Sequence, residues 1–251
     1  MTGAIADAYD RSADAWRRGP ARLYAQLADA LLDRSPGLVR DRVVLDAAAG
    51  TGAMGDAARK RGAARVVSTD LAPAMLSAPA VVADLVHLPF HDGAFDLALA
   101  GFVLGPLPEP EAGLGELRRV AAGVVASAFA EGWSHPAKRV VEQVLAERGY
   151  RPPAWYVAFK EGSERYVGDP ARLISLARAT GYAEVRVEQF EVTAGAVTAD
   201  DLVAWRLGMA HHAPFLATLS PATRDTVRSE AERELADAPP LVVPVLGLIA
   251  T

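Results

Sequence analysis

The feature that most constrains the fold is the stretch at residues 43–55, which reads VVLDAAAGTGAMG. A short apolar run ends in an acid, passes through small residues and glycines, and continues into a helical pattern. That order predicts a buried strand, a tight turn and the start of a helix. Glycines let a ligand approach bare backbone, and the helix begins with free N–H groups. The stretch therefore predicts a nucleotide-binding turn.

Two classes of nucleotide fit the glycines of this turn. Gly50, Gly52 and Gly55 match the GxGxxG spacing of dinucleotide-binding folds, so an NAD(P)-dependent oxidoreductase is one alternative. Asp46, however, ends the strand and precedes Gly50 by four residues. A carboxylate there repels a pyrophosphate and attracts a ligand that carries an ammonium and a sulfonium. The acid therefore favours a positively charged adenosyl donor.

A second acid follows the next expected strand. Residues 65–70, RVVSTD, are expected to form this strand, which ends in Asp70, twenty residues after Gly50. In nucleotide-binding folds an acid at this position accepts hydrogen bonds from the ribose hydroxyls. A plain helix-capping aspartate is the alternative, but the pairing with a glycine turn favours the ribose role.

Residues 88–100, LPFHDGAFDLALA, resemble the LPFPDGSFDLVL signature of small-molecule methyltransferases. With the glycine turn and Asp70, this makes the chain similar to class I S-adenosylmethionine-dependent methyltransferases, in their UbiE-like, natural-product-tailoring branch. Ala48 departs from the family pattern, which usually has glycine there. The resemblance implies S-adenosyl-L-methionine as cofactor and in-line methyl transfer to a small, apolar or aromatic metabolite, on oxygen, nitrogen or carbon. A cyclase or binding protein that keeps the cofactor without transferring methyl is a further alternative.

The same resemblance implies where the cofactor is held. An N-terminal arm with Tyr9 and Trp16 would lie over it, Leu71 and Met75 would flank the adenine, and Asp84 would accept from the adenine amino group. The expected cofactor-binding residues are Tyr9, Trp16, Asp46, Ala47, Ala48, Gly50, Gly52, Asp70, Leu71, Met75, Asp84, Leu85, Gly101 and Phe102.

Methyl transfer needs an aligned nucleophile, and a phenol or enol also needs a base. His135 follows the fifth expected strand, where the cleft should open, and is the first candidate base. His211 and His212 come next, and only one of an adjacent pair can face inward. Glu131 is a further candidate, and proximity without a base is the alternative to all four. The chain has no cysteine and no paired histidine spacing, so we expect no metal.

Strand and helix patterns alternate along the chain, which predicts an α/β fold with a doubly wound, mostly parallel sheet of seven strands. We expect an N-terminal helical arm at 1–40 and a Rossmann-like, cofactor-binding core at 41–129, 169–193 and 239–251. Residues 130–168 and 194–238 are expected to be helical lid insertions over the substrate. In the sixth strand the apolar positions change phase between Val187 and Phe190, which predicts a bulge.

Residue types, net charge and apolar runs indicate which kinds of substrate and partner this protein binds. The lid insertions contain large apolar and aromatic residues that suit an apolar, partly aromatic small-molecule substrate: Trp133, Trp155, Tyr156, Phe159, Trp205, Met209 and Phe215. The formal net charge is −5 and basic stretches are short, so we expect no nucleic-acid partner. The sequence shows neither a membrane-length apolar run nor a signal peptide, so we expect no membrane partner and a cytoplasmic location. We expect a monomer or homodimer.

Overall fold

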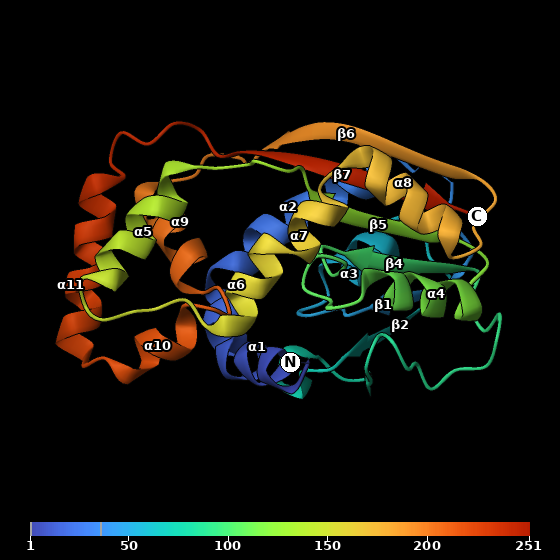
Figure 1. The fold of residues 1–251 in the computed structure, drawn as a ribbon, viewed down its shortest axis with the longest axis horizontal. Coiled ribbons are helices and arrows are strands. Elements are labelled where there is room, and N and C mark those ends of the chain that lie inside the picture. The colour runs from blue at the N-terminus through green and yellow to red at the C-terminus, as the bar shows by residue number, and fades with distance from the viewer. Residues whose placement is uncertain (1, 36) are drawn as a thin grey trace.

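The computed structural model describes residues 2–35 and 37–251. Seven strands form one sheet in the order β3-β2-β1-β4-β5-β7-β6 (Figure 1). Among the described strands only β7 runs against its neighbours, so the predicted doubly wound, mostly parallel sheet is confirmed. The strands are β1 (Val43–Ala47), β2 (Arg65–Asp70), β3 (Val81–Val82), β4 (Leu97–Gly101), β5 (Val124–Phe129), β6 (Val185–Thr193) and β7 (Val242–Ala250).

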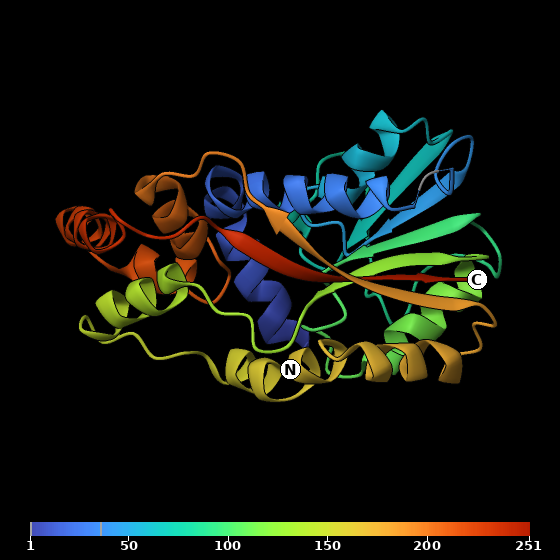
Figure 2. The same cartoon turned by 90° about the horizontal axis from the view of Figure 1, so that it is seen from above.

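Helices cover both faces of the sheet, as Figure 2 shows. On one face Leu23, Leu27 and Leu31 of α2 belong to a buried cluster that also includes residues of α3. On the other face Leu114 of α4 and Leu173 of α8 belong to a second cluster. The helices of the core and arm are α1 (Thr2–Arg18), α2 (Pro20–Asp33), α3 (Ala53–Lys60), the 3₁₀-helix η1 (Pro73–Met75), α4 (Pro110–Val120) and α8 (Pro170–Ala179).

Six further helices, called the lid helices below, follow β5 and β6. They are α5 (Pro136–Ala146), α6 (Ala154–Glu161), α7 (Ser163–Val167), α9 (Ala199–Leu207), α10 (Ala213–Thr218) and α11 (Pro221–Glu234). β5 and β6 are both antiparallel to β7, so they are parallel to each other. Both groups of lid helices therefore leave the sheet at carboxyl ends of strands, where ligands bind in doubly wound folds.

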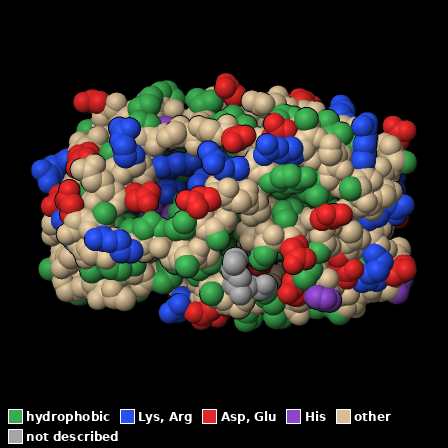
Figure 3. All heavy atoms as spheres, in the orientation of Figure 1, with side chains coloured by type: hydrophobic (Ala, Val, Ile, Leu, Met, Phe, Trp, Pro, Cys, Tyr) green, Lys and Arg blue, Asp and Glu red, His purple; other side chains and the backbone are tan. Residues whose placement is uncertain are grey.

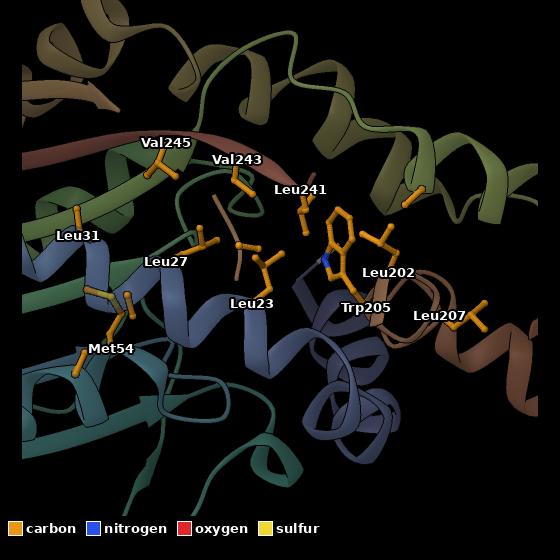
Figure 4. Packing of buried hydrophobic residues seen from close by; sticks show 14 of the residues in the cluster. Leu23, Leu27, Leu31, Met54, Leu202, Trp205, Leu207, Leu241, Val243 and Val245 are labelled. Carbon is orange, nitrogen blue, oxygen red and sulfur yellow. The ribbon is translucent and has the colours of Figure 1, made fainter. Parts of the chain in front are cut away.

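The lid helices share a core with the sheet rather than forming a separate one. α5, α9 and α11 pack against one another at the left of Figure 1, and α1 contacts both α9 and α10. Leu202 and Trp205 of α9 belong to the same buried cluster as Leu23 of α2 and Val243 of β7 (Figure 4). The division into arm, core and lids stays a prediction, because this continuous packing draws no boundary between them.

The predicted bulge in the sixth strand is wrong. β6 pairs with β7 in unbroken register from Val185 opposite Ala250 to Thr193 opposite Val242. Val185 and Val187 pack with the cluster that contains α8, whereas Phe190 and Val192 pack with the cluster that contains α2. The apolar phase therefore changes because this edge strand is covered on one face in its first half and on the other face in its second half.

Candidate functional site

The turn after β1 is held in left-handed backbone conformations. Ala48, Gly50 and Gly52 have φ angles of 49°, 54° and 93°. Glycine adopts this region freely, whereas alanine is strained there by about 1–2 kcal/mol. The chain enters α3 at Ala53, so bare backbone and a helix N-terminus adjoin each other.

Asp46 lies near the end of β1 and is 1% exposed. Its Oδ2 accepts a hydrogen bond of 2.8 Å from the Gly55 N–H, whereas Oδ1 is buried without a partner among the described residues. Burial, opposed by the Gly55 hydrogen bond, raises the pKa of this carboxyl to about 7. A Cβ on Gly55 would lie 2.7 Å from Asp46 Oδ2. The close approach of the Asp46 carboxyl therefore requires glycine at position 55.

Asp70, at the end of β2, joins two loops. Its Oδ2 accepts from the Gly50 N–H at 2.7 Å, and its Oδ1 accepts from the Ala72 N–H at 2.8 Å. Burial raises the pKa of this carboxyl, and the hydrogen bonds from Ala72 and Gly50 oppose that rise. A carboxylate has about four acceptor positions in all, so Asp70 keeps capacity for a further donor.

A cavity of about 1170 Å³, open on one side, lies over this turn and is called the glycine-loop cavity. All of the expected cofactor-binding residues line it except Ala47 and Gly52. Ala47 is fully buried in β1, and Gly52 is the N-cap of α3. Tyr9 and Trp16 reach the cavity from α1, which contacts η1. The structure thus brings together segments that lie up to about a hundred residues apart in the sequence, from Ile5 to Pro108.

The charges of the glycine-loop cavity are all of one sign. Asp46, Asp70 and Asp84 line it, and in the described part of the chain no lysine, arginine or histidine does. A diphosphate in this space would be repelled by three carboxylates, whereas a cationic ligand would be attracted. The buried, unpartnered Oδ1 of Asp46 also needs a hydrogen-bond donor, which an ammonium group supplies.

A second cavity of about 710 Å³ adjoins the first and is called the lid cavity. The two share Tyr9, Tyr24, Phe102 and Pro106. The expected lid residues that line it are Trp133, Trp155, Tyr156, Phe159, Trp205 and Met209. Phe215 does not line it and packs instead against Tyr150, with ring centroids 5.4 Å apart.

His211 is the one of the four candidate bases that lines the lid cavity. Its ring stacks on Tyr156 with centroids 3.7 Å apart, and its Nε2 lies 3.2 Å from Arg206 Nη2. Arginine can only donate, so this Nε2 accepts and the proton of the neutral ring sits on Nδ1. Burial first, and then the neighbouring His212 and Arg206, lower the pKa of His211 well below its usual value.

The other three candidates point elsewhere. His212 is fully buried and its Nδ1 donates to the Arg206 carbonyl at 2.8 Å. His135 caps α5, where Nδ1 accepts from Ala137 at 3.2 Å and Nε2 donates to the Pro239 carbonyl at 3.2 Å. Glu131 is exposed, with an oxygen 3.7 Å from Arg165. A catalytic role for any of the four stays a prediction.

Sequence reasoning missed Tyr24 and Arg206. Tyr24 lines both cavities, and its ring contacts those of Trp16 and Phe102 at centroid distances of 5.0 and 5.5 Å. An aromatic residue directly beside the leucine stripe of α2 was the available signal, because it must point away from the sheet. Arg206 left no comparable signal, since a lone arginine in a helix is ordinarily exposed.

The described helices include none that is long and apolar enough to cross a membrane. Residues 2–35 and 37–251 also contain no group of three or more histidine, aspartate or glutamate side chains placed to hold a metal ion.

Comparison with known proteins decides the family. A methyltransferase domain family matches residues 45–123, from β1 to the loop before β5. The ubiquinone/menaquinone biosynthesis C-methyltransferase UbiE of Cupriavidus taiwanensis is 30% identical over 219 residues, which cover 77% of this chain and 86% of that protein. This chain belongs to the UbiE-like class I S-adenosylmethionine-dependent methyltransferases. The UbiE-like methyltransferase uses S-adenosyl-L-methionine, as the sequence resemblance implied, and membership of this family speaks against the NAD(P)-dependent oxidoreductase.

Solved structures share the fold of this UbiE-like methyltransferase. Phosphoethanolamine N-methyltransferase 2 of Haemonchus contortus, in complex with phosphomonomethylethanolamine and S-adenosylhomocysteine, matches with a TM-score of 0.53 at 17% identity, over 90% of this chain and 52% of that chain. The [4+2]-cyclase SpnF matches with a TM-score of 0.52 at 17% identity, over 90% and 80% of the two chains. At this identity the likeness shows the fold alone.

Proposed function

We propose that the UbiE-like methyltransferase methylates a small, apolar or aromatic metabolite bound in the lid cavity, with S-adenosyl-L-methionine bound in the glycine-loop cavity. One observation carries the proposal: the two cavities meet along a shared border of Tyr9, Tyr24, Phe102 and Pro106. A methyl acceptor in one cavity and a donor in the other would meet at that border. The aromatic lining of the lid cavity supports the substrate class.

The aspartates are proposed to orient the cofactor. Asp46 Oδ1 would accept from its ammonium group, and Asp70 would accept from the ribose hydroxyls through the remaining lone pairs of its oxygens. The family resemblance adds Leu71 and Met75 beside the adenine and Asp84 with Leu85 at its edge. The cofactor supplies a methyl group already activated by a sulfonium.

The residues of the lid cavity are proposed to align the acceptor and exclude water rather than to take its proton. His211 Nε2 is already occupied by Arg206, and the lowered pKa makes the ring a weak base. Holding two reacting groups in line supplies much of the rate of such a displacement by itself. Phe102 of this border packs on Phe129, which contacts Trp133, and these rings would help to exclude water beside the reacting groups.

The test separates cofactor binding from transfer. Calorimetry with S-adenosylhomocysteine and with NAD is expected to show binding of the first and none of the second. Labelled S-adenosylmethionine is then incubated with a panel of phenols, amines and carboxylic acids, and label is expected in at least one product. Binding of NAD with the same affinity as S-adenosylhomocysteine would refute the assignment of the glycine-loop cavity.

A matched pair of variants tests the lid cavity. Tyr156→Ala removes a ring that lines this cavity alone, whereas Tyr166→Ala removes a 41% exposed ring on α7. We expect Tyr156→Ala to lower the transfer rate by about tenfold or more through lost alignment, and to leave the affinity for S-adenosylhomocysteine unchanged. Tyr166→Ala should change neither. Equal rates in both variants would remove the lid cavity as the substrate site.

A further inference from the structure

Three cationic side chains line the part of the lid cavity that is not shared with the glycine-loop cavity. Lys138 of α5, Lys160 of α6 and Arg206 of α9 line it, and Glu164 is the one carboxylate among its described lining residues. The view in Figure 3 shows basic side chains around a hollow over the lid helices. With His211 neutral, the fully protonated cluster carries an excess of two positive charges.

Arg206 is buried without a counter-ion. It is 3% exposed, its Nη2 donates to His211, and its Nε has no partner. Neither Arg206 nor Lys138 takes part in a salt bridge among the residues that the structure describes. Buried charges in proteins are ordinarily paired, because a charge loses its hydration on burial and needs an opposite charge to compensate that loss. A buried arginine without a counter-ion therefore indicates that a bound ligand supplies the negative charge.

Lys138 and Lys160 flank this arginine. Lys138 Nζ donates to the Trp133 carbonyl at 3.2 Å and lies 3.5 Å from the centroid of the Trp133 ring. Burial first, and then the charges of Arg206 and Lys160, lower the pKa of Lys138 to about 7. Lys160 is paired with Glu164. The lysines thus repel Arg206 and each other, and one carboxylate does not offset them.

A row of aromatic rings leads from the border with the glycine-loop cavity to Lys138. The ring of Phe102 stacks on Phe129 with centroids 4.4 Å apart, and Phe129 contacts Trp133 at 4.9 Å. Phe102 belongs to both cavities, whereas Lys138, over Trp133, belongs to the lid cavity and the hollow outside it. A ligand that extends along these rings from the cofactor border toward Lys138 meets aromatic surface first and positive charge after it.

We propose that the substrate is an apolar or aromatic molecule with an oxyanion, a carboxylate or a phosphate, at the end opposite its methyl-accepting atom, and that Lys138, Lys160 and Arg206 bind this oxyanion. The inference rests on the proposed function, because it takes the lid cavity to be the substrate site. Arginine forms a planar fork that matches either oxyanion, and the lysines add point charges. The anion also supplies the missing counter-charge for Arg206.

The test compares three probes that share one ring system: 2-naphthoate, 2-naphthyl phosphate and the neutral 2-naphthamide. Each is titrated calorimetrically into protein saturated with S-adenosylhomocysteine. At least one oxyanion is expected to bind tenfold or more tightly than the amide, and the tighter of the two identifies carboxylate or phosphate. Equal binding of all three, or no binding of any at millimolar concentration, would overturn the proposal.

Charge-removing variants locate the effect. Lys138→Met and Arg206→Met are each expected to lose tenfold or more of the preference for the oxyanion over the amide. Arg139→Met, an exposed neighbour on the same helix, should keep the full preference. A preference that survives in both Lys138→Met and Arg206→Met would place the anion elsewhere and refute the inference.

Binding of S-adenosylhomocysteine is measured first in every protein, which reports folding and the glycine-loop cavity separately. A protein that binds S-adenosylhomocysteine but not the oxyanion loses this inference and keeps the cofactor assignment. A protein that binds neither loses the proposed function as well.

Discussion

The two adjoining cavities of this protein carry opposite charge. Three aspartates and no cation line the described part of the glycine-loop cavity, whereas two lysines, an arginine and a single glutamate line the lid cavity. They meet at an uncharged border of aromatic rings and a proline. The difference suits a positively charged methyl donor on one side and an anionic acceptor on the other, with little that would let either ligand bind in the wrong cavity.

The two cavities are also built differently. The glycine-loop cavity is shaped by backbone at the ends of β1, β2 and β4, and Ala48 and Phe102 there hold positive φ angles of 49° and 56°. The lid cavity is lined mainly by side chains of helices, with further residues from β5 and from the loops that follow β4, β5 and α9. Backbone strain of this kind collects at functional sites, where the surrounding structure holds it in place. Changes in the first cavity should therefore act through loop geometry, and changes in the second through charge and packing.

Asp70→Ala is expected to have the largest effect. It removes the acceptor of the Gly50 and Ala72 N–H groups and the proposed acceptor of the ribose. The loss is on the order of 2–4 kcal/mol in binding, or roughly 30- to 1,000-fold in the dissociation constant of S-adenosylhomocysteine. Calorimetry measures it, with the exposed Asp225→Ala on α11 as the control. An unchanged constant would contradict the role of Asp70.

The pH dependence of cofactor binding should be the next largest effect. Burial raises the pKa of Asp46 to about 7 and also raises that of Asp70. An ammonium group favours the ionised carboxylate, so binding releases protons and weakens as pH falls below about 7. From pH 8 to pH 6 we expect the affinity for S-adenosylhomocysteine to fall about tenfold, one decade for each pH unit below the pKa.

Asp46→Asn provides the control for that pH dependence. It cannot ionise, so the slope with pH should flatten while binding is weaker throughout. A slope that persists in the variant would assign the titration to Asp70 instead.

Lys138→Met tests, without any ligand, whether the positive charge in the lid cavity destabilises the fold. Burial lowers the pKa of Lys138 to about 7 in the folded protein from its usual 10.5, so wild-type stability is reduced at neutral and lower pH and recovers as pH rises toward 10.5. The variant is expected to raise the melting temperature by about 2–4 °C at pH 7, equivalent to roughly 1 kcal/mol after the loss of the Trp133 contacts. The gain should shrink at higher pH.

Thermal unfolding of the wild type and of Lys138→Met from pH 6 to pH 10 measures this difference in melting temperature. A melting temperature lowered at every pH would mean that Lys138 stabilises the fold and is not an uncompensated charge.

Ala48→Gly should have the smallest effect. It relieves about 1–2 kcal/mol of left-handed strain at Ala48 but adds about 0.4–1 kcal/mol of unfolded-state entropy, which leaves a gain of roughly 0.5 kcal/mol. Ala49→Gly, next to it without a positive φ, has no strain to relieve and should lose stability instead. Chemical denaturation measures both free energies of unfolding, and the opposite order would show that Ala48 is not strained.

Much of the glycine-loop cavity was predictable because local sequence encodes it. An acid at the end of a strand, glycines in the turn and a second acid twenty residues later follow from the geometry of parallel strands, whose carboxyl ends meet at one edge. The same local signals gave the sheet and its mostly parallel order. The predicted bulge failed because the phase of apolar residues in β6 depends on which helix covers each face, and that is a tertiary property.

The sequence by itself determined where bare backbone and negative charge gather, because residues 43–55 and Asp70 fold locally and the sheet aligns them. Only the tertiary structure decided the lid cavity. In it His211 lines the lid cavity and His212 does not, and His135 caps a helix. Arg206 is buried and lines this cavity together with two lysines from other helices. Helix–helix packing brings together side chains far apart in the sequence, and each of them taken alone resembles an ordinary surface residue.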